Sequence, residues 1–189
     1  MKKKTEKAAK NFREAAEQAG LRRIIYLGGL GDETDRLSHH LASRHEVARI
    51  LQSGKVKTTV LRAAVIVGAG GASFEIVRYL VERLPVLLCP RWVYTESQPI
   101  AIDNVLEYLA GCLETPETEG RSLDIGGPQI LSYADLMRMY AKVRGLSRTI
   151  IGVPMVPVRL SAYWVNLITP VPAGGFAPGR RAAKHSHLP

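Results

Sequence analysis

The chain has 189 residues, of which 46% are hydrophobic and 23% are charged, and these proportions fit a globular protein with a buried core and exclude a disordered chain. The net charge of +9 is concentrated at the ends: the first ten residues carry +4 and residues 174–189 carry +3, which leaves +2 for the rest. A nucleic-acid-binding domain concentrates positive charge on a folded face, so we interpret the excess as solubility charge and expect no nucleic-acid partner.

Cysteine content and hydropathy indicate the compartment. Cys89 and Cys112 lie far apart and form no C-x-x-C pair, which predicts two reduced, buried thiols and a cytoplasmic location. The first residues, MKKKTEKAAKNF, have a basic run without the apolar core of a secretory signal. No stretch of about 18 uninterrupted apolar residues occurs, so we expect no transmembrane segment.

The first part of the chain alternates between helical and strand-like patterns. Apolar residues at spacings of three and four predict a helix over 4–19 that ends at Gly20. The continuous apolar run 24–27 predicts a buried strand, and the glycine-rich loop GGLG follows it. Helical periodicity returns over 35–53, where Gly54 is the expected C-terminal cap.

The same alternation continues to about residue 145. A second buried strand is predicted over 58–68, and Ser73 is placed to cap a helix over 74–84 that Pro85 ends. The other predicted elements are short strands over 86–88, 99–102 and 123–127, a helix from Asp103 as its cap to about Leu113, and a helix that begins with a capping box of Ser132 and Asp135 and ends at Gly145.

The order of these elements predicts the fold class. Strands that alternate with helices, with glycine loops at the carboxyl ends of strands, indicate an α/β protein with a doubly wound parallel sheet. We expect one domain over 1–150 and, over 151–189, one helix near 158–168 followed by a mobile tail. The aromatic pair Tyr163 and Trp164 is expected to pack on the domain's own flank; docking of a partner or a lipid surface is the alternative.

Five segments in a fixed order carry a resemblance to a known family. They are NFREAAEQAGLRRIIYLGGLG (11–31), SRHEVARIL (43–51), TVLRAAVIVGAGGASFEIVRYLVERLP (59–85), QPIAIDNVLEYL (98–109) and LDIGGPQILSYADLM (123–137). In these segments the chain resembles the atypical and extended short-chain dehydrogenase/reductase superfamily, especially its NAD(P)-binding, nucleoside-diphosphate-sugar-epimerase-like members. The resemblance implies a partial Rossmann-like sheet with a small C-terminal α+β substrate-side region, and NAD or NADP as the cofactor.

The start of that family's fold is absent from the sequence. Members resembling this chain open with a strand, a G-x-x-G-x-x-G turn and a helix whose first amides hold the pyrophosphate. The glycine clusters at 28–31 and 68–71 lie elsewhere in the pattern, because the resemblance begins at the helix before the family's fifth strand. We expect an incomplete copy or a misplaced start; a half borrowed from a protein partner is the alternative. Dinucleotide binding by this chain alone should be weak or absent.

The family's catalytic positions carry different residues here. Members have Ser or Thr at the end of the fifth strand and Tyr-x-x-x-Lys on the next helix, where lysine lowers the pKa of the tyrosine. Aligning SRHE with the usual S-K-x-x-E places His40 at the tyrosine position and Arg44 at the lysine position, with Gly28 and Gly29 at the strand end. Histidine can move a proton and arginine can hold a ribose or phosphate, but we expect no ordinary dehydrogenase triad.

The resemblance also suggests binding positions. Those for the cofactor are Leu27, Gly28, Gly29, Arg44, Ala63, Ala64 and Val65, and those for an unknown small-molecule substrate are Ser73, Phe74, Arg91 and Gln98. The GGLG loop fits a tight turn equally well, and Ser73 and Phe74 fit capping or core roles. No metal site is expected, because His39, His40 and His45 diverge around a helix.

Two functions follow from this pattern. The intact relative would bind NAD(P)H and act as a reductase or epimerase. The alternative is a non-catalytic module of the same fold that senses the cofactor or serves as an assembly subunit, which fits the replacements at Gly28, His40 and Arg44.

Overall fold

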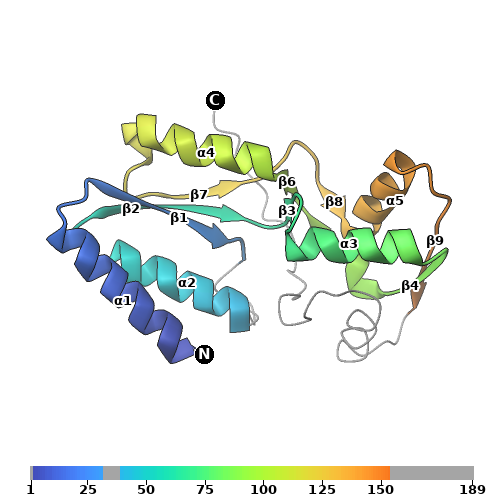
Figure 1. The fold of residues 1–189 in the computed structure, drawn as a ribbon, viewed down its shortest axis with the longest axis horizontal. Coiled ribbons are helices and arrows are strands. Elements are labelled where there is room, and N and C mark those ends of the chain that lie inside the picture. The colour runs from blue at the N-terminus through green and yellow to red at the C-terminus, as the bar shows by residue number, and fades with distance from the viewer. Residues whose placement is uncertain (1, 32–38, 154–189) are drawn as a thin grey trace. The chain divides into compact units, whose positions relative to one another are not determined.

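The computed structural model describes residues 2–31 and 39–153, and the chain forms two compact units (Figure 1). The first unit comprises the residues up to Ala64 together with Ile100–Gly126, and the second comprises Val65–Pro99 and the residues from Gly127 onward. Within the described ranges, no helix combines the length and apolar character needed to cross a bilayer. The predicted domain over 1–150 stays a prediction, and the expected helix at 158–168 lies outside the described residues.

A parallel sheet organises the first unit. Its elements are α1 (Lys2–Gln18), β1 (Arg23–Gly29), α2 (His39–Gln52), β2 (Lys57–Ala63), β6 (Ile100–Ala101), α4 (Ile102–Glu114), the 3-10 turn η2 (Pro116–Thr118) and β7 (Ser122–Ile125). The strand order is β1-β2-β7, and both neighbouring pairs are parallel. The predicted α/β class with parallel strands is therefore confirmed.

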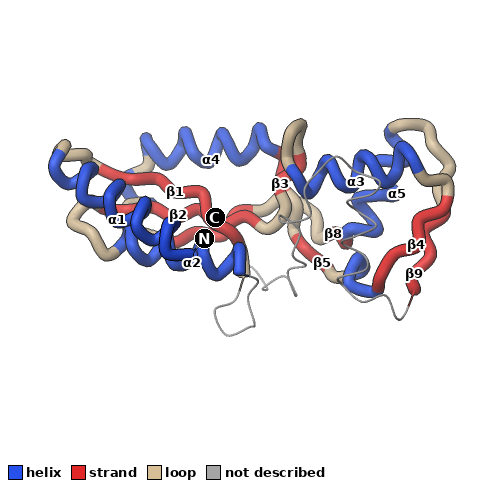
Figure 2. The backbone as a smooth tube through the Cα atoms, turned by 60° about the horizontal axis from the view of Figure 1, so that its bottom comes forward, coloured by secondary structure: helices blue, strands red, loops and turns tan. Residues whose placement is uncertain are grey.

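Helices cover both faces of this sheet. Figures 1 and 2 show α1 and α2 on one face and α4 on the opposite face. A small apolar cluster forms the core between this pair of helices and the sheet. Its buried members are Ala16 of α1, Ile24 of β1, Leu51 of α2 and Val56 just before β2, and Tyr26 and Val47 pack against them. The middle strand is the best protected, because Val60 and Leu61 of β2 are each 1% exposed.

Shorter strands and two helices build the second unit. Its elements are β3 (Ile66–Val67), α3 (Ala72–Arg83), β4 (Val86–Pro90), the 3-10 turn η1 (Arg91–Tyr94), β5 (Glu96–Ser97), β8 (Leu131–Ser132), α5 (Tyr133–Val143) and β9 (Thr149–Val153). Strand β4 pairs in parallel with β9, and β5 pairs antiparallel with β8. Val81 and Ala134, on α3 and α5, are fully buried in the core of this unit.

The capping box at the start of α5 is confirmed. The Ser132 hydroxyl accepts a hydrogen bond from the Asp135 amide at 3.1 Å, and the Asp135 carboxylate accepts one from the Ser132 amide at 3.0 Å. The Ser132 hydroxyl also donates to the Asp135 carboxylate, and this hydrogen bond, with the one from the Ser132 amide, holds the pKa of Asp135 below its usual value. Gly145, which follows the helix, has a φ of 65° and ends it as predicted.

Two predicted N-caps and the end of one predicted strand are wrong. Helix α3 begins at Ala72 after Gly71, so Ser73 lies inside its first turn, and its hydroxyl hydrogen-bonds to Tyr133. Helix α4 begins at Ile102 without a side-chain cap, which leaves Asp103 in the first turn, where its charge favours the helix dipole. The strand predicted over 58–68 ends at Ala63, because the chain passes from the first unit to the second after Ala64.

Gly54 is required for close packing, and the prediction that it caps α2 is wrong. Its φ is not positive, and a Cβ added there would lie 2.7 Å from Cγ of Arg13 on α1. The Glu17 carboxylate on the same helix accepts a hydrogen bond from the Lys55 amide at 2.8 Å. The turn after α2 therefore lies directly against Arg13 and Glu17 of α1, and a side chain at position 54 would have to displace one of these two side chains.

This packing gives a paired test. We expect Gly54→Ala to lower the free energy of unfolding by about 1–3 kcal/mol, because the new methyl group forces α1 away from the turn. Gly111→Ala is the control: nothing lies within 4 Å of the added Cβ, and alanine inside α4 should raise stability by about 0.5–1 kcal/mol. Denaturant unfolding measures both. Equal stability of the two variants would contradict the packing described.

Candidate functional site

The carboxyl ends of β1 and β2 form the candidate site of the first unit. Strand β1 ends in Gly28 and Gly29, and the register pairs these glycines with Arg62 and Ala63 of β2. The pairing extends one residue further, since the Leu30 amide donates to the Ala63 carbonyl at 2.9 Å. Ligands of open parallel sheets bind at this end of the strands, so the position suits a binding site.

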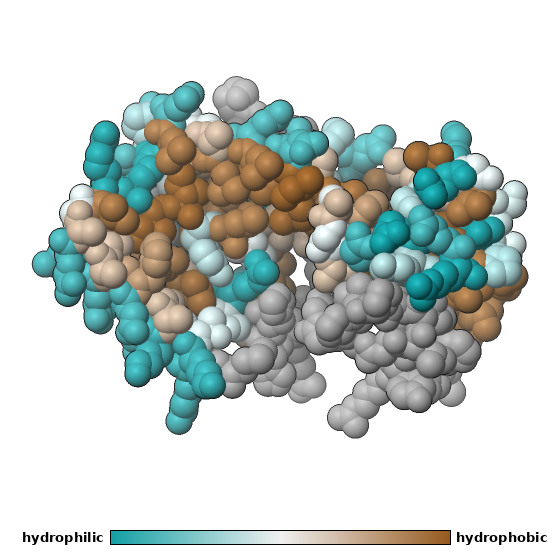
Figure 3. Space-filling view, in the orientation of Figure 1, coloured by the Kyte–Doolittle hydropathy of each residue, from teal (hydrophilic) through white to brown (hydrophobic). Residues whose placement is uncertain are grey.

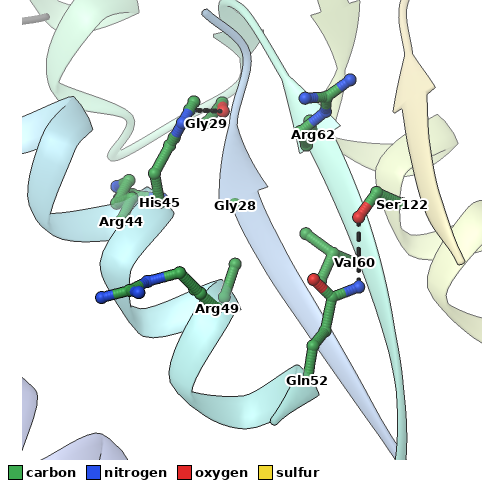
Figure 4. Close-up of a pocket in the computed structure, with 10 residues that line it drawn as sticks. Gly28, Gly29, Arg44, His45, Arg49, Gln52, Val60, Arg62 and Ser122 are labelled. Carbon is green, nitrogen blue, oxygen red and sulfur yellow. Dashed lines mark hydrogen bonds between the residues drawn. The ribbon is translucent and has the colours of Figure 1, made fainter. Parts of the chain in front are cut away.

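The glycine pair brings bare backbone close to helix α2. A Cβ added at Gly29 would lie 2.5 Å from Cδ1 of Leu41 and 3.5 Å from Cδ of Arg44. The carbonyl of Gly29 lies 3.1 Å from Nε2 of His45, within hydrogen-bond distance (Figure 4). Helix α2 therefore packs on the end of β1, and a larger side chain at Gly29 would displace the leucine.

A pocket of about 120 Å³ lies between α2 and the sheet (Figure 4). Most of the side chains that line it are polar, and several of them are cationic. The lining residues are Gly28, Gly29, Arg44, His45, Ala48, Arg49, Gln52, Val60, Arg62 and Ser122. They come from β1, β2 and β7 and from one face of α2, on which the lining residues recur every three to four positions.

Side-chain contacts fix the walls of the pocket. Arg62 donates from Nε to the Asp124 carboxylate at 2.5 Å, which joins β2 to β7. Gln52 of α2 donates to the Ser122 hydroxyl at 3.1 Å (Figure 4). An arginine on a helix face opposite a glycine backbone can hold a phosphate or ribose by its planar fork of donors, but it does not titrate near neutral pH.

Tyr26 and Arg44 are linked electrostatically. Burial raises the pKa of the Tyr26 hydroxyl, and the positive charge of Arg44 partly offsets this increase. Tyr26 lies on β1, two residues before Gly28. Its ring lies beside that glycine, since a Cβ added at Gly28 would be 3.5 Å from Cε1 of the ring. The phenol therefore stays protonated near neutral pH, so it can donate a hydrogen bond but does not act as a base.

The structure brings together three of the predicted cofactor positions. Gly28, Gly29 and Arg44 line the same pocket. Leu27 lies half-buried on β1, and Ala63 is buried at the end of β2 while Ala64 is exposed. Val65 belongs to the apolar core of the second unit. The backbone of His40 lies in the first turn of α2, but its side chain lies outside what the structure describes.

The four predicted substrate positions all fall in the second unit. Ser73 hydrogen-bonds to Tyr133, and the ring of Phe74 packs edge-on against Tyr140 with centroids 5.8 Å apart. Gln98 donates to the Gly127 carbonyl at 2.6 Å. Arg91 is exposed at the start of η1. The first three thus have structural contacts of their own, and their role in binding substrate stays a prediction.

Several pocket residues were not singled out from the sequence. Gln52 and Arg49 could have been found from the helical spacing that places them on one face with His45 and Ala48. Ser122 had no local signal, because its place beside Val60 depends on a parallel pairing between β2 and β7 across more than fifty intervening residues. Among the described residues, no three potential ligands gather as a metal site.

Solved structures share this fold, whereas no family model and no curated protein matches the sequence. The UDP-glucuronic acid 4-epimerase of Bacillus cereus, in complex with NAD, matches with a TM-score of 0.64 and 17% identity, over 77% of this chain and 54% of its own. The nucleoside-diphosphate-sugar epimerase of Staphylococcus aureus matches with a TM-score of 0.64 and 19% identity, over 82% and 53%.

A reductase gives the same result. The dTDP-4-dehydrorhamnose reductase of Bacillus anthracis, in complex with NADP, matches with a TM-score of 0.63 and 12% identity, over 78% of this chain and 56% of its own. The chain thus spans about half the length of the structures it matches. These likenesses show a Rossmann-like fold, in a partial version of that seen in NAD(P)-dependent epimerases and reductases.

The link between Tyr26 and Arg44 can be measured by titration. We expect Arg44→Met to raise the pKa of Tyr26 further, because the neutral side chain no longer stabilises the phenolate. Arg62→Met should leave that pKa unchanged, since the Arg62 guanidinium pairs with Asp124. Ring-carbon NMR shifts followed as the pH is raised measure both. A Tyr26 pKa that Arg44→Met leaves unchanged or lowers would contradict the contact.

Proposed function

We propose that this chain forms the nicotinamide side and the substrate side of an NAD(P)-binding protein of the epimerase and reductase kind. The observation that carries the proposal is the glycine pair at the carboxyl end of β1, held against α2 beside Arg44. The two glycines line the same pocket as Arg44, and solved structures of the same fold contain NAD or NADP.

Each residue of the site then has a defined task. The backbone of Gly28 and Gly29 forms the wall against which the ring lies, and Arg44 binds a ribose hydroxyl or phosphate oxygen. The ring, when bound, supplies hydride transfer. His40, in the first turn of α2, is the group that could move a proton to or from the substrate oxygen, since its neutral imidazole both donates and accepts.

Affinity for the dinucleotide should be low for this chain by itself. The sequence has no G-x-x-G-x-x-G turn, the motif that places the first amides of a helix against the pyrophosphate. In the described residues, β1 also lacks a neighbour on its outer edge. The described residues therefore lack the strongest anion contacts of such a site, and we expect the ring side to need a second polypeptide segment to hold the cofactor tightly.

A non-catalytic role is the second candidate. Gly28 and Gly29 provide no hydroxyl to orient a carbonyl, and Arg44 cannot exchange a proton near neutral pH. A module of this kind would bind the cofactor, or a partner that carries it, without turnover. The replacements at the strand end and on α2 favour this reading over ordinary dehydrogenase chemistry.

Binding is tested by calorimetric titration with NADH and NADPH. We expect weak binding to the chain, which Arg44→Ala reduces further by about 1.5–3 kcal/mol, the value of a hydrogen bond to a charged group. Lys55→Ala is the matched control, because it removes one positive charge before β2, at the opposite end of the strands. Equal losses in both variants would show that only general charge is involved and would overturn the proposed site.

Turnover distinguishes the two candidate functions. Hydride exchange is followed by loss of NADH absorbance with a panel of carbonyl and sugar-nucleotide substrates, for the chain and for His40→Ala. Activity that His40→Ala removes, with binding retained, supports a reductase or epimerase. Binding without activity, unchanged by His40→Ala, supports the non-catalytic module and excludes the proton-transfer role of His40.

A further inference from the structure

Strand β1 has an outer edge with which no other strand pairs in the part of the chain that the structure describes. The sheet order is β1-β2-β7, so β2 occupies only the inner edge of β1. The Leu30 amide donates to the Ala63 carbonyl of β2, and backbone groups point to alternate edges along a parallel strand. The amides and carbonyls of Ile25 and Leu27 therefore point to the outer edge, where they form a template for another strand.

The side chains of β1 do not protect this edge. Charged residues and prolines are the usual means by which an edge strand avoids pairing. After Arg23 the strand reads IIYLGG and contains neither. Arg23 itself donates to the Glu119 carboxylate at 2.8 Å, so its charge already has a partner within the chain. A strand that approaches the edge meets only apolar side chains and glycines.

One face of β1 is also incompletely covered. Ile24 and Tyr26 pack in the cluster under α1 and α2, so Ile25 and Leu27 point to the opposite face. On that face Leu61 of β2, the register partner of Leu27, is 1% exposed. Ile25 and Leu27 are only half-buried. The cover from the described residues thus ends between β2 and β1, and a strand added beside β1 would bury apolar surface as well as backbone.

We propose that the outer edge of β1 pairs antiparallel with β1 of a second copy of this chain, across a twofold axis at Tyr26. With this axis, Ile25 of each copy lies opposite Leu27 of the other, and the outward amides and carbonyls of both pairs hydrogen-bond to one another. Tyr26 lies opposite Tyr26 of the second copy, on the face of the helices. The two sheets become one continuous sheet.

The pattern of β1 is self-complementary in this arrangement, which is why a second copy fits the edge. Directly opposite side chains are the contacts that stabilise paired strands, and here they are isoleucine with leucine and tyrosine with tyrosine. Arg23 lies opposite Gly29 of the second copy, so like charges do not meet along the strand. A contact of this kind is isologous and closes as a dimer. The inference does not depend on the proposed cofactor site.

NMR of the wild-type chain tests the pairing without any substitution. Sedimentation should show a reversible dimer. A mixture of 13C-labelled and unlabelled chains should then give intermolecular NOEs between the methyl groups of Ile25 and Leu27. A monomer at every concentration would overturn the proposal, including the case in which another segment of the same chain occupies the edge. Intermolecular NOEs at Leu88 and Ile151, the exposed apolar pair of β4 and β9, in place of those at β1 would also overturn it.

A charge exchange tests the register. Ile25→Lys and Leu27→Glu should each lower the association constant at least about tenfold, because each places an unpaired charge opposite an apolar side chain. An equal mixture of the two variants should recover the dimer, since lysine 25 of one chain then faces glutamate 27 of the other.

Leu88→Glu is the control for this exchange, at a 67% exposed position of the second unit, and it should leave the dimer unchanged. Circular dichroism identifies the variants that are folded. Folded variants whose mixture stays monomeric, or an equal loss of dimer in Leu88→Glu, would overturn the pairing. If either substitution at β1 prevents folding, the NOEs of the wild-type chain decide.

Discussion

The strands of a parallel sheet are covered on both faces, and an edge strand leaves one row of backbone amides and carbonyls unpaired; these two constraints govern what the chain can do. Strand β2 is covered and paired, since β1 and β7 pair with its two edges and Thr59, Val60 and Leu61 are almost fully buried. Strand β1, in the part of the chain that the structure describes, pairs with β2 alone. The Leu30 amide donates to Ala63 of β2, and backbone amides point to alternate edges along a strand. The amides of Ile24, Tyr26 and Gly28 therefore also point to β2. Those of Ile25, Leu27 and Gly29 point to the outer edge.

The surroundings of that open edge are apolar. Figure 3 shows hydrophobic side chains gathered along α4 and the strands next to it. The exposed apolar residues of α4 include Leu106 at 55% and Leu113 at 68%. Neither proline nor a charged side chain interrupts β1 after Arg23, and these are the usual means by which an edge strand avoids pairing. The outer edge of β1 is therefore suited to pairing with another strand, and the last residues along this edge are Gly28 and Gly29.

The sequence predicts a feature correctly where that feature depends only on residues close together in the chain. The capping box of Ser132 and Asp135 involves residues three apart, and the buried run at 24–27 needs no knowledge of its partners. Gly54 was misread, because the contact with Arg13 that requires glycine depends on how α1 packs, which periodicity does not give. The pocket was predicted only at Gly28, Gly29 and Arg44. Its wall at Gln52, Arg62 and Ser122 depends on the pairing of β2 with β7.

Residue-resolved amide hydrogen exchange shows whether the outer edge of β1 is open. We expect fast exchange at Ile25, Leu27 and Gly29 in dilute solution, with strong protection at Tyr26 and Gly28, whose amides face β2. Equal protection at all five positions, independent of protein concentration, would show that the outer edge of β1 is already paired.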